Sequence, residues 1–139
     1  MTQADSSTAK KKIRVVAALI QRPSDSRILI TQRSPKATMP LKWEFPGGKV
    51  EASESDQIAL QRELKEELGV EVKIGNEFMS LFHSYEEFDI DFHVYHCTMV
   101  SKNIQKLNIH DFRWVELTEL SQFEFPAADQ STIRQLLDV

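Results

Sequence analysis

The strongest constraint on this chain is a helical segment at residues 55–68 that places three glutamates within five positions. Apolar side chains recur there at steps of three and four residues, at Ile58, Ala59, Leu60, Leu64 and Leu68. Ser53 or Ser55 can cap the start of such a helix, and Gly69 can end it. The pattern therefore predicts a helix from Ser55 to Leu68.

Glu63, Glu66 and Glu67 stand at positions i, i+3 and i+4 of this helix, so their side chains share one face. Like charges at this spacing repel one another, and such a cluster is relieved by binding protons or cations. Clusters of oxygen ligands suit hard ions, above all Mg²⁺, which also binds substrate phosphate. The spacing favours a divalent-metal site for phosphate chemistry, with a solvated helix face as the plain alternative.

Length and composition indicate one domain behind a polar tail. The chain has 139 residues, of which 41% are hydrophobic, and residues 12–139 can therefore form one core. Residues 1–11 are small, polar and lysine-rich, which is typical of a disordered tail.

The formal net charge of −4 excludes a general affinity for nucleic acid, so any nucleotide contact must be local. No stretch approaches the run of about 18 apolar residues that crosses a bilayer, and the start lacks the apolar core of a signal peptide. The single cysteine, Cys97, is expected to be a small core residue in a reducing compartment. We expect a cytoplasmic protein with no membrane partner.

The segments around the predicted helix show strand and turn patterns. Strands are predicted at about residues 13–21, 27–33, 71–85, 88–100 and 112–117, and a final helix begins near Ala128. Residues 34–48 contain three prolines and two glycines and are expected to form a loop with a short extended piece near Trp43. This order fits an α/β (α+β) fold with a mixed sheet and helices on its faces.

The spacing around the glutamates follows a known motif. From Gly48 the chain resembles the Nudix box, G-x5-E-x7-R-E-U-x-E-E-x-G-U with U aliphatic, at every fixed position. The matching residues are Gly48, Glu54, Arg62, Glu63, Leu64, Glu66, Glu67, Gly69 and Val70. The stretches "WEFPGGKVE" and "FEFPAAD" look like the MutT-like branch, so the resemblance covers about residues 13–137. It implies a Nudix-type α/β/α sandwich with a mixed β-sheet.

The resemblance implies attack of water on a phosphorus of a nucleoside diphosphate that is linked to another group. Glu63, Glu66 and Glu67 resemble the family's ligands for Mg²⁺, or for Mn²⁺ in its place, with the backbone carbonyl of Gly47 as a further ligand. One glutamate serves as the base; Glu63 is the predicted base and Glu67 the firmest ligand, with Glu66 in the same catalytic group. Arg62 is expected to orient a glutamate through a charge-assisted hydrogen bond.

Two further motif features have predicted structural roles. Glu54 is expected to hold loop and helix together, in a pair with Arg62. Gly47 and Gly48 are expected to leave room for a sharp turn and for close approach of the backbone to a metal.

Residues that select the substrate lie outside the box. By the resemblance, Arg33 at the end of the second strand contacts substrate phosphate or sugar, with an ordinary surface arginine as the alternative. Glu44 and Phe45 would form the pocket wall, where Phe45 offers its ring to a base. Trp43 fits a pocket and a core position equally well.

The chain departs from the family at Asp129, where well-known 8-oxo-dGTP diphosphatases of the MutT type carry an asparagine. An asparagine donates and accepts hydrogen bonds, whereas an ionised aspartate only accepts them. Asp129 could accept hydrogen bonds from N–H groups of an oxidised guanine or from the amine of a cytosine, so the base preference stays open. The alternative is that Asp129 caps the last helix.

A second departure is Ile109, which stands before His110 where many family members have a glutamate. If that glutamate supplies an extra metal ligand elsewhere, this chain binds fewer ions or uses a substitute such as Glu87. His83, His93 and His96 lie in predicted strands and are expected to be structural rather than metal-binding.

Three functions follow from these observations. The leading hypothesis is Mg²⁺-dependent hydrolysis of a nucleoside triphosphate to a monophosphate and pyrophosphate, which removes nucleotides such as 8-oxo-dGTP. Other enzyme hypotheses are hydrolysis of CTP or dCTP, and removal of pyrophosphate from RNA 5′ ends. A binding module without catalysis is the least favoured, because a retired site has no reason to keep repelling carboxylates. The sequence allows a monomer or a homodimer.

Overall fold

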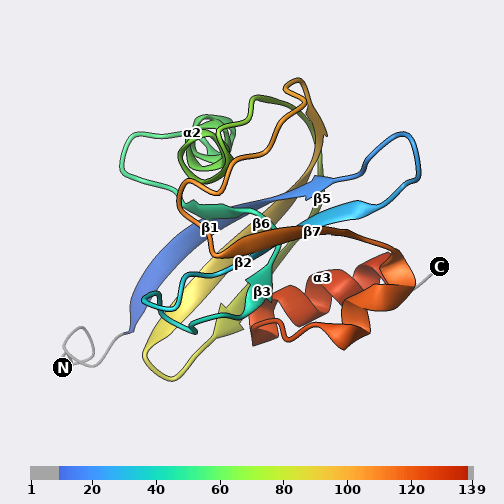
Figure 1. The fold of residues 1–139 in the computed structure, drawn as a ribbon. Coiled ribbons are helices and arrows are strands. Elements are labelled where there is room, and N and C mark those ends of the chain that lie inside the picture. The colour runs from blue at the N-terminus through green and yellow to red at the C-terminus, as the bar shows by residue number, and fades with distance from the viewer. Residues whose placement is uncertain (1–9, 138–139) are drawn as a thin grey trace, which may run out of the picture.

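The computed structural model describes residues 10–137 of the chain, so the predicted tail lies outside the description up to residue 9 (Figure 1). Lys11 already belongs to the first strand. The elements are β1 Lys11–Ile20, β2 Ile28–Gln32, β3 Trp43–Glu44, β4 Gly47–Lys49, α2 Asp56–Leu68, β5 Val72–Ser84, β6 Phe88–Met99, β7 Asp111–Val115, the 3-10 helix η1 Leu117–Gln122 and α3 Ala127–Leu137. The predicted helices and long strands are confirmed, whereas β4 and η1 fall where no strand or helix was predicted.

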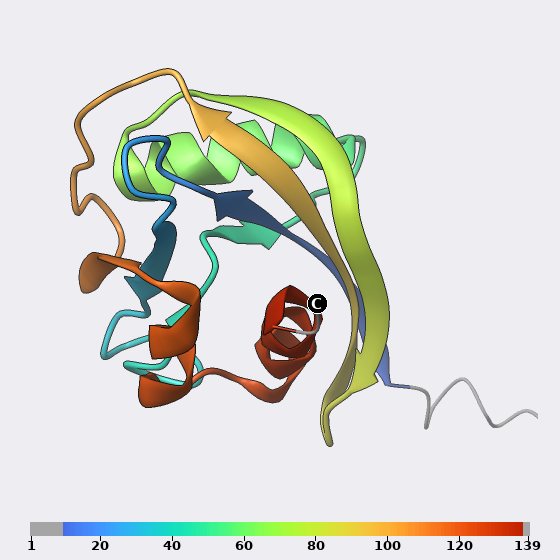
Figure 2. The ribbon, with the colours of Figure 1, turned by 90° about the vertical axis from the view of Figure 1, so that its right-hand side faces the viewer.

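The described strands form two sheets. The larger sheet has the order β4-β1-β6-β5, with β1 parallel to β6 and the other pairs antiparallel, so the predicted mixed sheet is confirmed. The smaller sheet has the order β3-β2-β7 and is antiparallel throughout. Local turn and strand patterns do not predict that the strands divide into two sheets, because the division depends on which distant strands pair. Strands β5 and β6 bend along their length (Figure 2).

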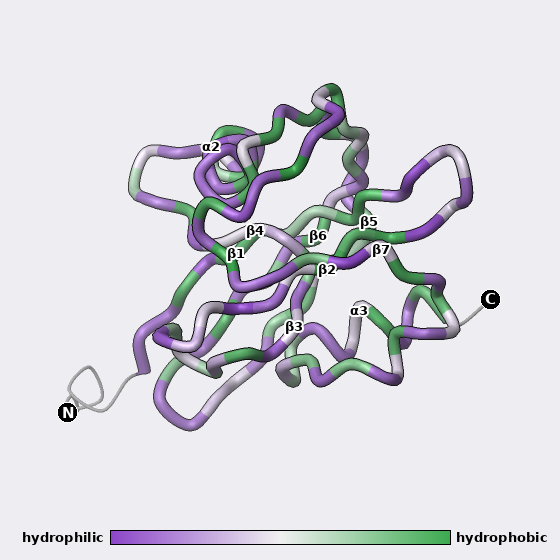
Figure 3. Tube along the Cα trace, in the orientation of Figure 1, coloured by the Kyte–Doolittle hydropathy of each residue, from purple (hydrophilic) through white to green (hydrophobic). Residues whose placement is uncertain are grey.

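Helices cover both sides of the strands, with α2 above and α3 below in Figure 1. Alternate side chains of β1 therefore enter two different cores. Val16, Ala18 and Ile20 pack with the apolar face of α2, whereas Ala17 and Leu19 belong to the cluster that includes Ile133 of α3. This double burial explains why β1 reads as an almost continuous apolar run. Figure 3 shows hydrophobic and hydrophilic stretches interspersed along the chain.

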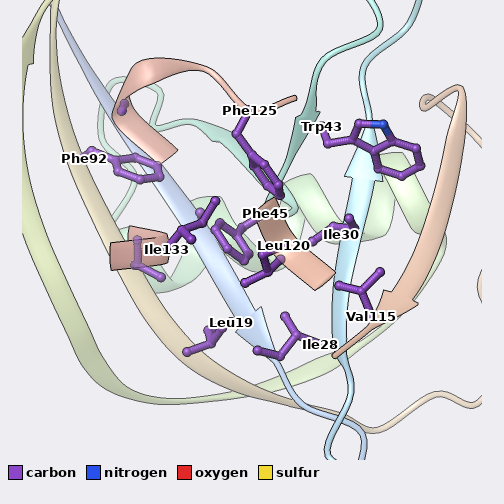
Figure 4. Close-up of a cluster of buried hydrophobic side chains, with 13 residues drawn as sticks. Leu19, Ile28, Ile30, Trp43, Phe45, Phe92, Val115, Leu120, Phe125 and Ile133 are labelled. Atoms are coloured by element: carbon purple, nitrogen blue, oxygen red, sulfur yellow. The ribbon is translucent and has the colours of Figure 1, made fainter. Parts of the chain in front are cut away.

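The α3-side cluster is rich in aromatic residues. Phe45 lies among Phe125, Leu120 and Ile133 (Figure 4), and its ring centroid is 5.6 Å from that of Phe125. Trp43 is 9% exposed and packs edge-on against Phe123, so it is a core residue rather than a pocket residue. Cys97 is buried and its pKa is raised to about 12 by burial, which confirms it as a core residue.

Helix α2 begins and ends as the sequence indicates. The hydroxyl of Ser55 accepts a hydrogen bond from the backbone N–H of Ile58 at 3.2 Å. Gly69 closes the helix with φ of 67°, in the left-handed region that glycine tolerates best. Within residues 10–137, no helix is both long and apolar enough to pass through a bilayer.

Candidate active site

One cavity, of about 440 Å³, lies between β1, the β3–β4 segment, the β5–β6 turn and the start of α3. The predicted site residues that line it are Arg33, Glu44, Phe45, Gly47, Glu67 and Asp129. Gly48 also lines the cavity, and its backbone lies against the carboxylate of Glu63. The fold thus brings together residues that lie up to 96 positions apart, from Arg33 to Asp129.

Arg62 joins the start of the motif to its glutamates. Its Nε and Nη2 bind the two carboxylate oxygens of Glu54 at 2.6 and 2.8 Å, and Nη2 also donates to the carbonyl of Lys49 at 3.0 Å. This contact holds the pKa of Glu54 down, to about 2. The expected pair of Glu54 and Arg62 is therefore present, and it binds the loop after β4 to helix α2.

Gly48 and Arg62 both restrict the position of Glu63. A Cβ on Gly48 would stand 2.4 Å from the carboxyl carbon of Glu63. Nη1 of Arg62 lies 3.2 Å from an oxygen of the same carboxylate. Burial raises the pKa of Glu63, although the charge of Arg62 opposes this.

Gly47 has a steric reason in addition to the one predicted, which stays a prediction. A Cβ there would lie 2.0 Å from the carbonyl oxygen of Val16, which no native packing allows. The described structure therefore explains the two glycines by close approach of β4 to β1 and to Glu63.

Glu67 is a buried carboxylate whose pKa is strongly raised. Its Oε1 atom is buried and has no hydrogen-bond partner among the described residues. The pKa of Glu67 is raised to about 9, chiefly by burial and then by the charges of Glu44 and Glu63. A buried carboxylate oxygen without a partner is costly, and a hard cation would satisfy it. This atom fits the predicted metal site.

Glu66 is turned away from that position. Its side chain is 57% exposed and lies 3.3 Å from Nη1 of Arg62. Among residues 10–137, no three His, Cys, Asp or Glu side chains are grouped closely enough to hold a metal ion. Nη1 of Arg62 contacts Glu63 at 3.2 Å as well as Glu66, so both carboxylates face this cation. The ligand set of Gly47, Glu63, Glu66 and Glu67 stays a prediction, supported by the unpaired oxygen of Glu67 and the position of Glu63.

Arg33 is a fixed residue of the cavity rather than a loose surface arginine. It binds Glu44 Oε1 through Nη1 at 2.9 Å, the carbonyl of Thr38 through Nε at 2.6 Å and the hydroxyl of Thr38 through Nη2 at 3.0 Å. Burial nevertheless raises the pKa of Glu44. Contact of Arg33 with substrate stays a prediction.

Asp129 is the third residue of α3 and is 7% exposed, so it does not precede the helix as a capping residue would. Burial, followed by the charge of Glu44, raises the pKa of Asp129 well above its usual range. Its carboxyl group lines the cavity and can exist there as a neutral acid, which both donates and accepts hydrogen bonds. The motif alone predicts an ionised Asp129 that only accepts hydrogen bonds, because burial cannot be read from the motif.

Other cavity residues were missed or left open. Tyr85, Phe88 and Met39 line the cavity. The aromatic character of the turn after β5 could have indicated Tyr85 and Phe88, whereas no pattern in the loop before β3 indicated Met39. Glu87, named as a substitute ligand, also lines it, and that role stays a prediction. Ile109 packs against the core cluster under α2.

The histidines of β5 and β6 have structural partners. His93 Nδ1 lies 2.7 Å from Glu77 Oε2, and its Nε2 lies 2.9 Å from Asp91 Oδ1. His83 and His96 pack edge-on against Tyr85 and Phe78. The expectation that these histidines are structural agrees with their positions.

A mixed sheet between two helices, with a glutamate-bearing helix behind a glycine turn and a cavity beside it, is the architecture of an α/β/α sandwich with one candidate site. A sequence profile of the NUDIX domain matches residues 16–135. The chain belongs to the Nudix hydrolases, in their MutT-like branch.

Proteins similar to this chain are named for two activities, CTP pyrophosphohydrolase and 8-oxo-dGTP diphosphatase. The CTP pyrophosphohydrolase of Escherichia coli K12 is 37% identical over 119 residues, which cover 86% of this chain and 87% of that protein. The 8-oxo-dGTP diphosphatase of the same strain is 32% identical over 133 residues, covering 91% and 97%. The solution structure of the E. coli ORF135 protein has a TM-score of 0.78 at 31% identity, covering 99% of this chain and 94% of that one.

Proposed function

We propose that this Nudix hydrolase converts a nucleoside triphosphate into a monophosphate and pyrophosphate, and that its substrate is an oxidised purine nucleotide such as 8-oxo-dGTP. The observation that carries the proposal is one cavity of about 440 Å³ lined by both Asp129 and Glu67. Asp129 can read a base by hydrogen bonding, and Glu67 belongs to the helix that bears the motif carboxylates. The two ends of a nucleotide thus have partners in the same space.

Mg²⁺ is the proposed cofactor, with Mn²⁺ as a substitute. When bound, it would supply neutralisation of the phosphate charge that builds up during transfer. Glu67 and Glu63 would hold it, with Glu66 and the carbonyl of Gly47 completing the oxygen ligands. The unpaired Oε1 of Glu67 supports this assignment.

The protein's own groups have distinct proposed roles at the phosphate end. Glu63 takes the proton of the attacking water, from a position against Gly48 at the cavity wall. Arg62 keeps the Glu63 carboxylate in place from one side, at 3.2 Å. Arg33 and Glu44 form a rigid pair that positions the nucleotide between the phosphate and base ends.

Asp129 and Phe45 are the proposed residues at the base end. An 8-oxoguanine presents O6 as an acceptor and the new N7–H as a donor. A neutral Asp129 can satisfy both, as an asparagine would. This removes the objection that an ionised aspartate could only accept. Phe45 is 2% exposed and contributes to the apolar wall of the cavity.

A second candidate is hydrolysis of CTP or dCTP. It is favoured by the 37% identity to the E. coli CTP pyrophosphohydrolase. A neutral Asp129 could also donate to N3 of cytosine and accept from its amine. The same residue therefore supports both bases, and only kinetics can separate them.

Hydrolysis at RNA 5′ ends has weaker support. The lysines considered for a basic groove were Lys36, Lys42, Lys102 and Lys106. Lys42 pairs with Glu124 at 3.3 Å and Lys106 with Asp111 at 3.4 Å, so two of the four are already neutralised. A cytoplasmic location and a monomeric or homodimeric state remain part of the proposal.

The deciding experiment compares kcat/KM for 8-oxo-dGTP, dGTP and CTP in Mg²⁺, with the products identified. We expect a preference for 8-oxo-dGTP over dGTP of about a hundredfold, which is about 2.7 kcal/mol of transition-state discrimination. A preference for CTP of similar size would establish the second candidate. Slow turnover of all three would contradict both.

A further inference from the structure

Tyr85 links the turn after β5 to the start of α3. It follows Ser84, the last residue of β5, and its half-buried side chain lines the cavity beside Phe88. Its phenolic oxygen accepts a hydrogen bond from the backbone N–H of Ala128 at 3.0 Å. Ala128 is the residue immediately before Asp129, so Tyr85 holds the helical turn that carries the proposed base reader.

The ring of Tyr85 belongs to an aromatic group at the base end of the cavity. Its centroid is 4.6 Å from the ring of His83 and 5.2 Å from the ring of Phe88. Tyr85 and Phe88 line the cavity together with Asp129. Planar aromatic surfaces bind nucleobases by stacking, and a hydrogen-bonding group beside them supplies the choice of base.

Several contacts fix the position of Tyr85. Its backbone N–H donates to the carbonyl of Phe88 at 2.8 Å, and its carbonyl accepts from Lys10 Nζ at 2.6 Å. Asp89, also in this turn region, accepts from the hydroxyl of Ser84 at 2.7 Å and lies 3.4 Å from Lys10 Nζ. The turn is therefore held by Lys10, which precedes β1, and by Phe88 of β6, and these contacts give Tyr85 the rigidity that a specificity residue needs.

We propose that Tyr85 determines nucleotide specificity in two ways: its ring contacts the nucleobase, and its hydroxyl holds Asp129 at the base edge through Ala128. This inference rests on the proposed nucleoside triphosphate substrate. It assigns to the β5–β6 turn a function that the motif residues do not supply. The ring and the hydroxyl can be separated by substitution.

The test compares kcat/KM of Tyr85→Ala, Tyr85→Phe and wild type on four substrates. These are 8-oxo-dGTP, dGTP, CTP and 1,2-dideoxyribose 5′-triphosphate, which has no base. Tyr85→Ala should lower kcat/KM for the preferred nucleotide about tenfold or more, from lost stacking, and should change the base-free substrate less than about threefold. Tyr85→Phe keeps the ring, so it should mainly reduce the discrimination between nucleotides. An equal loss on all four substrates would overturn the assignment.

Tyr95→Phe is the matched control, because Tyr95 is the chain's other tyrosine and its hydroxyl donates to Asp56 at 2.6 Å, outside the cavity lining. It should leave the ratio of nucleotide activities unchanged in the folded protein. A change in that ratio as large as the one in Tyr85→Phe would contradict the proposal.

Binding separates failure of this inference from failure of the proposed function. The affinities of 8-oxo-dGMP and CMP are measured by calorimetry for wild type and Tyr85→Ala. If wild type hydrolyses no nucleoside triphosphate, the proposed function fails, and a loss of nucleotide affinity of about fivefold or more in Tyr85→Ala still supports base contact. Equal affinities of wild type and Tyr85→Ala would overturn the role of Tyr85 whatever the turnover.

Discussion

The buried carboxylates near the two ends of helix α2 differ in their hydrogen-bond partners and in the direction of their pKa shifts. At the start of the helix, Asp56 is 8% exposed and accepts from Arg14 Nε and Nη2 at 2.8 Å each and from the Tyr95 hydroxyl at 2.6 Å. Its pKa is lowered, first by the hydrogen bonds from Arg14. Near the other end, Glu67 has a buried oxygen with no partner among the described residues, and its pKa is raised to about 9.

The difference separates a structural carboxylate from a functional one. Asp56 is fully paired, so it contributes to the attachment of α2 to the sheet and has no capacity left for a ligand. Glu67 is incompletely paired, which costs stability and leaves an oxygen free for a cation or proton. Both are acids on one helix, and only their partners distinguish them.

Replacing Glu67 by Gln should have the largest effect. We expect kcat/KM in Mg²⁺ to fall by about 10²- to 10³-fold, because a ligand of the ion that would neutralise the phosphate charge is lost. In Mg²⁺-free buffer the same variant should be more stable by about 1 kcal/mol, since a buried unpaired carboxylate is removed. Fixed-time activity assays measure the change in kcat/KM, and urea denaturation measures the change in stability.

Glu71→Gln is the control for that variant, because Glu71 is 66% exposed and lies beyond the end of α2. It should change neither quantity appreciably. Unchanged turnover in Glu67→Gln would contradict the metal assignment.

Replacing Arg14 by Met should affect stability instead of chemistry. The variant leaves the Asp56 carboxylate with Tyr95 alone, and we expect a loss of about 2 kcal/mol, less than for a fully buried pair because Arg14 is 44% exposed. The folded fraction should keep kcat/KM within about twofold, since the mechanism uses neither residue. A large loss of kcat without loss of stability would show that this pair, too, belongs to the functional site.

Asp129→Asn should have a smaller effect than loss of the side chain. If Asp129 acts as a neutral acid, an asparagine keeps one donor and one acceptor, so kcat/KM for the preferred nucleotide should fall less than about fivefold. Asp129→Leu should lose about ten- to a hundredfold, because the base edge is then unpaired. Equal losses in both variants would favour an ionised Asp129.

The pH dependence of unfolding should be the most subtle test. The pKa of Asp56 is lower in the folded state than in the unfolded state. Its ionised side chain therefore contributes to the free energy of unfolding above the unfolded-state pKa of about 3.9. This contribution is lost as pH falls through the folded-state pKa. The raised pKa of Asp129 has the opposite effect on stability. Its contribution to the free energy of unfolding is full below the unfolded-state pKa and is lost as pH rises towards the folded-state pKa.

Denaturation curves between about pH 2 and pH 8 can separate these contributions. Arg14→Met should weaken the loss of stability on the acid side, and Asp129→Asn should weaken the decline as pH rises. Curves parallel to wild type in both variants would show that neither carboxyl group has a perturbed pKa.

Much of the fold could be predicted from local patterns. The apolar spacing, Ser55 and Gly69 determine where α2 begins and ends, because hydrogen bonds in a helix join residues four apart. The mixed sheet followed from the order of strands and helices. The smaller sheet could not be predicted in this way, because β2 pairs with β7 across a long stretch of chain.

The sequence by itself determined the motif, the helix that carries it and the identity of the residues that could serve a metal or a base. Tertiary structure decided which carboxylates are paired: Arg14 reaches Asp56 across 42 positions, whereas Oε1 of Glu67 is buried without a partner. It also placed Trp43 in the core and Tyr85 at the cavity. The physical reason is that spacing is a local property, whereas burial and ion pairing depend on groups brought together from distant parts of the chain.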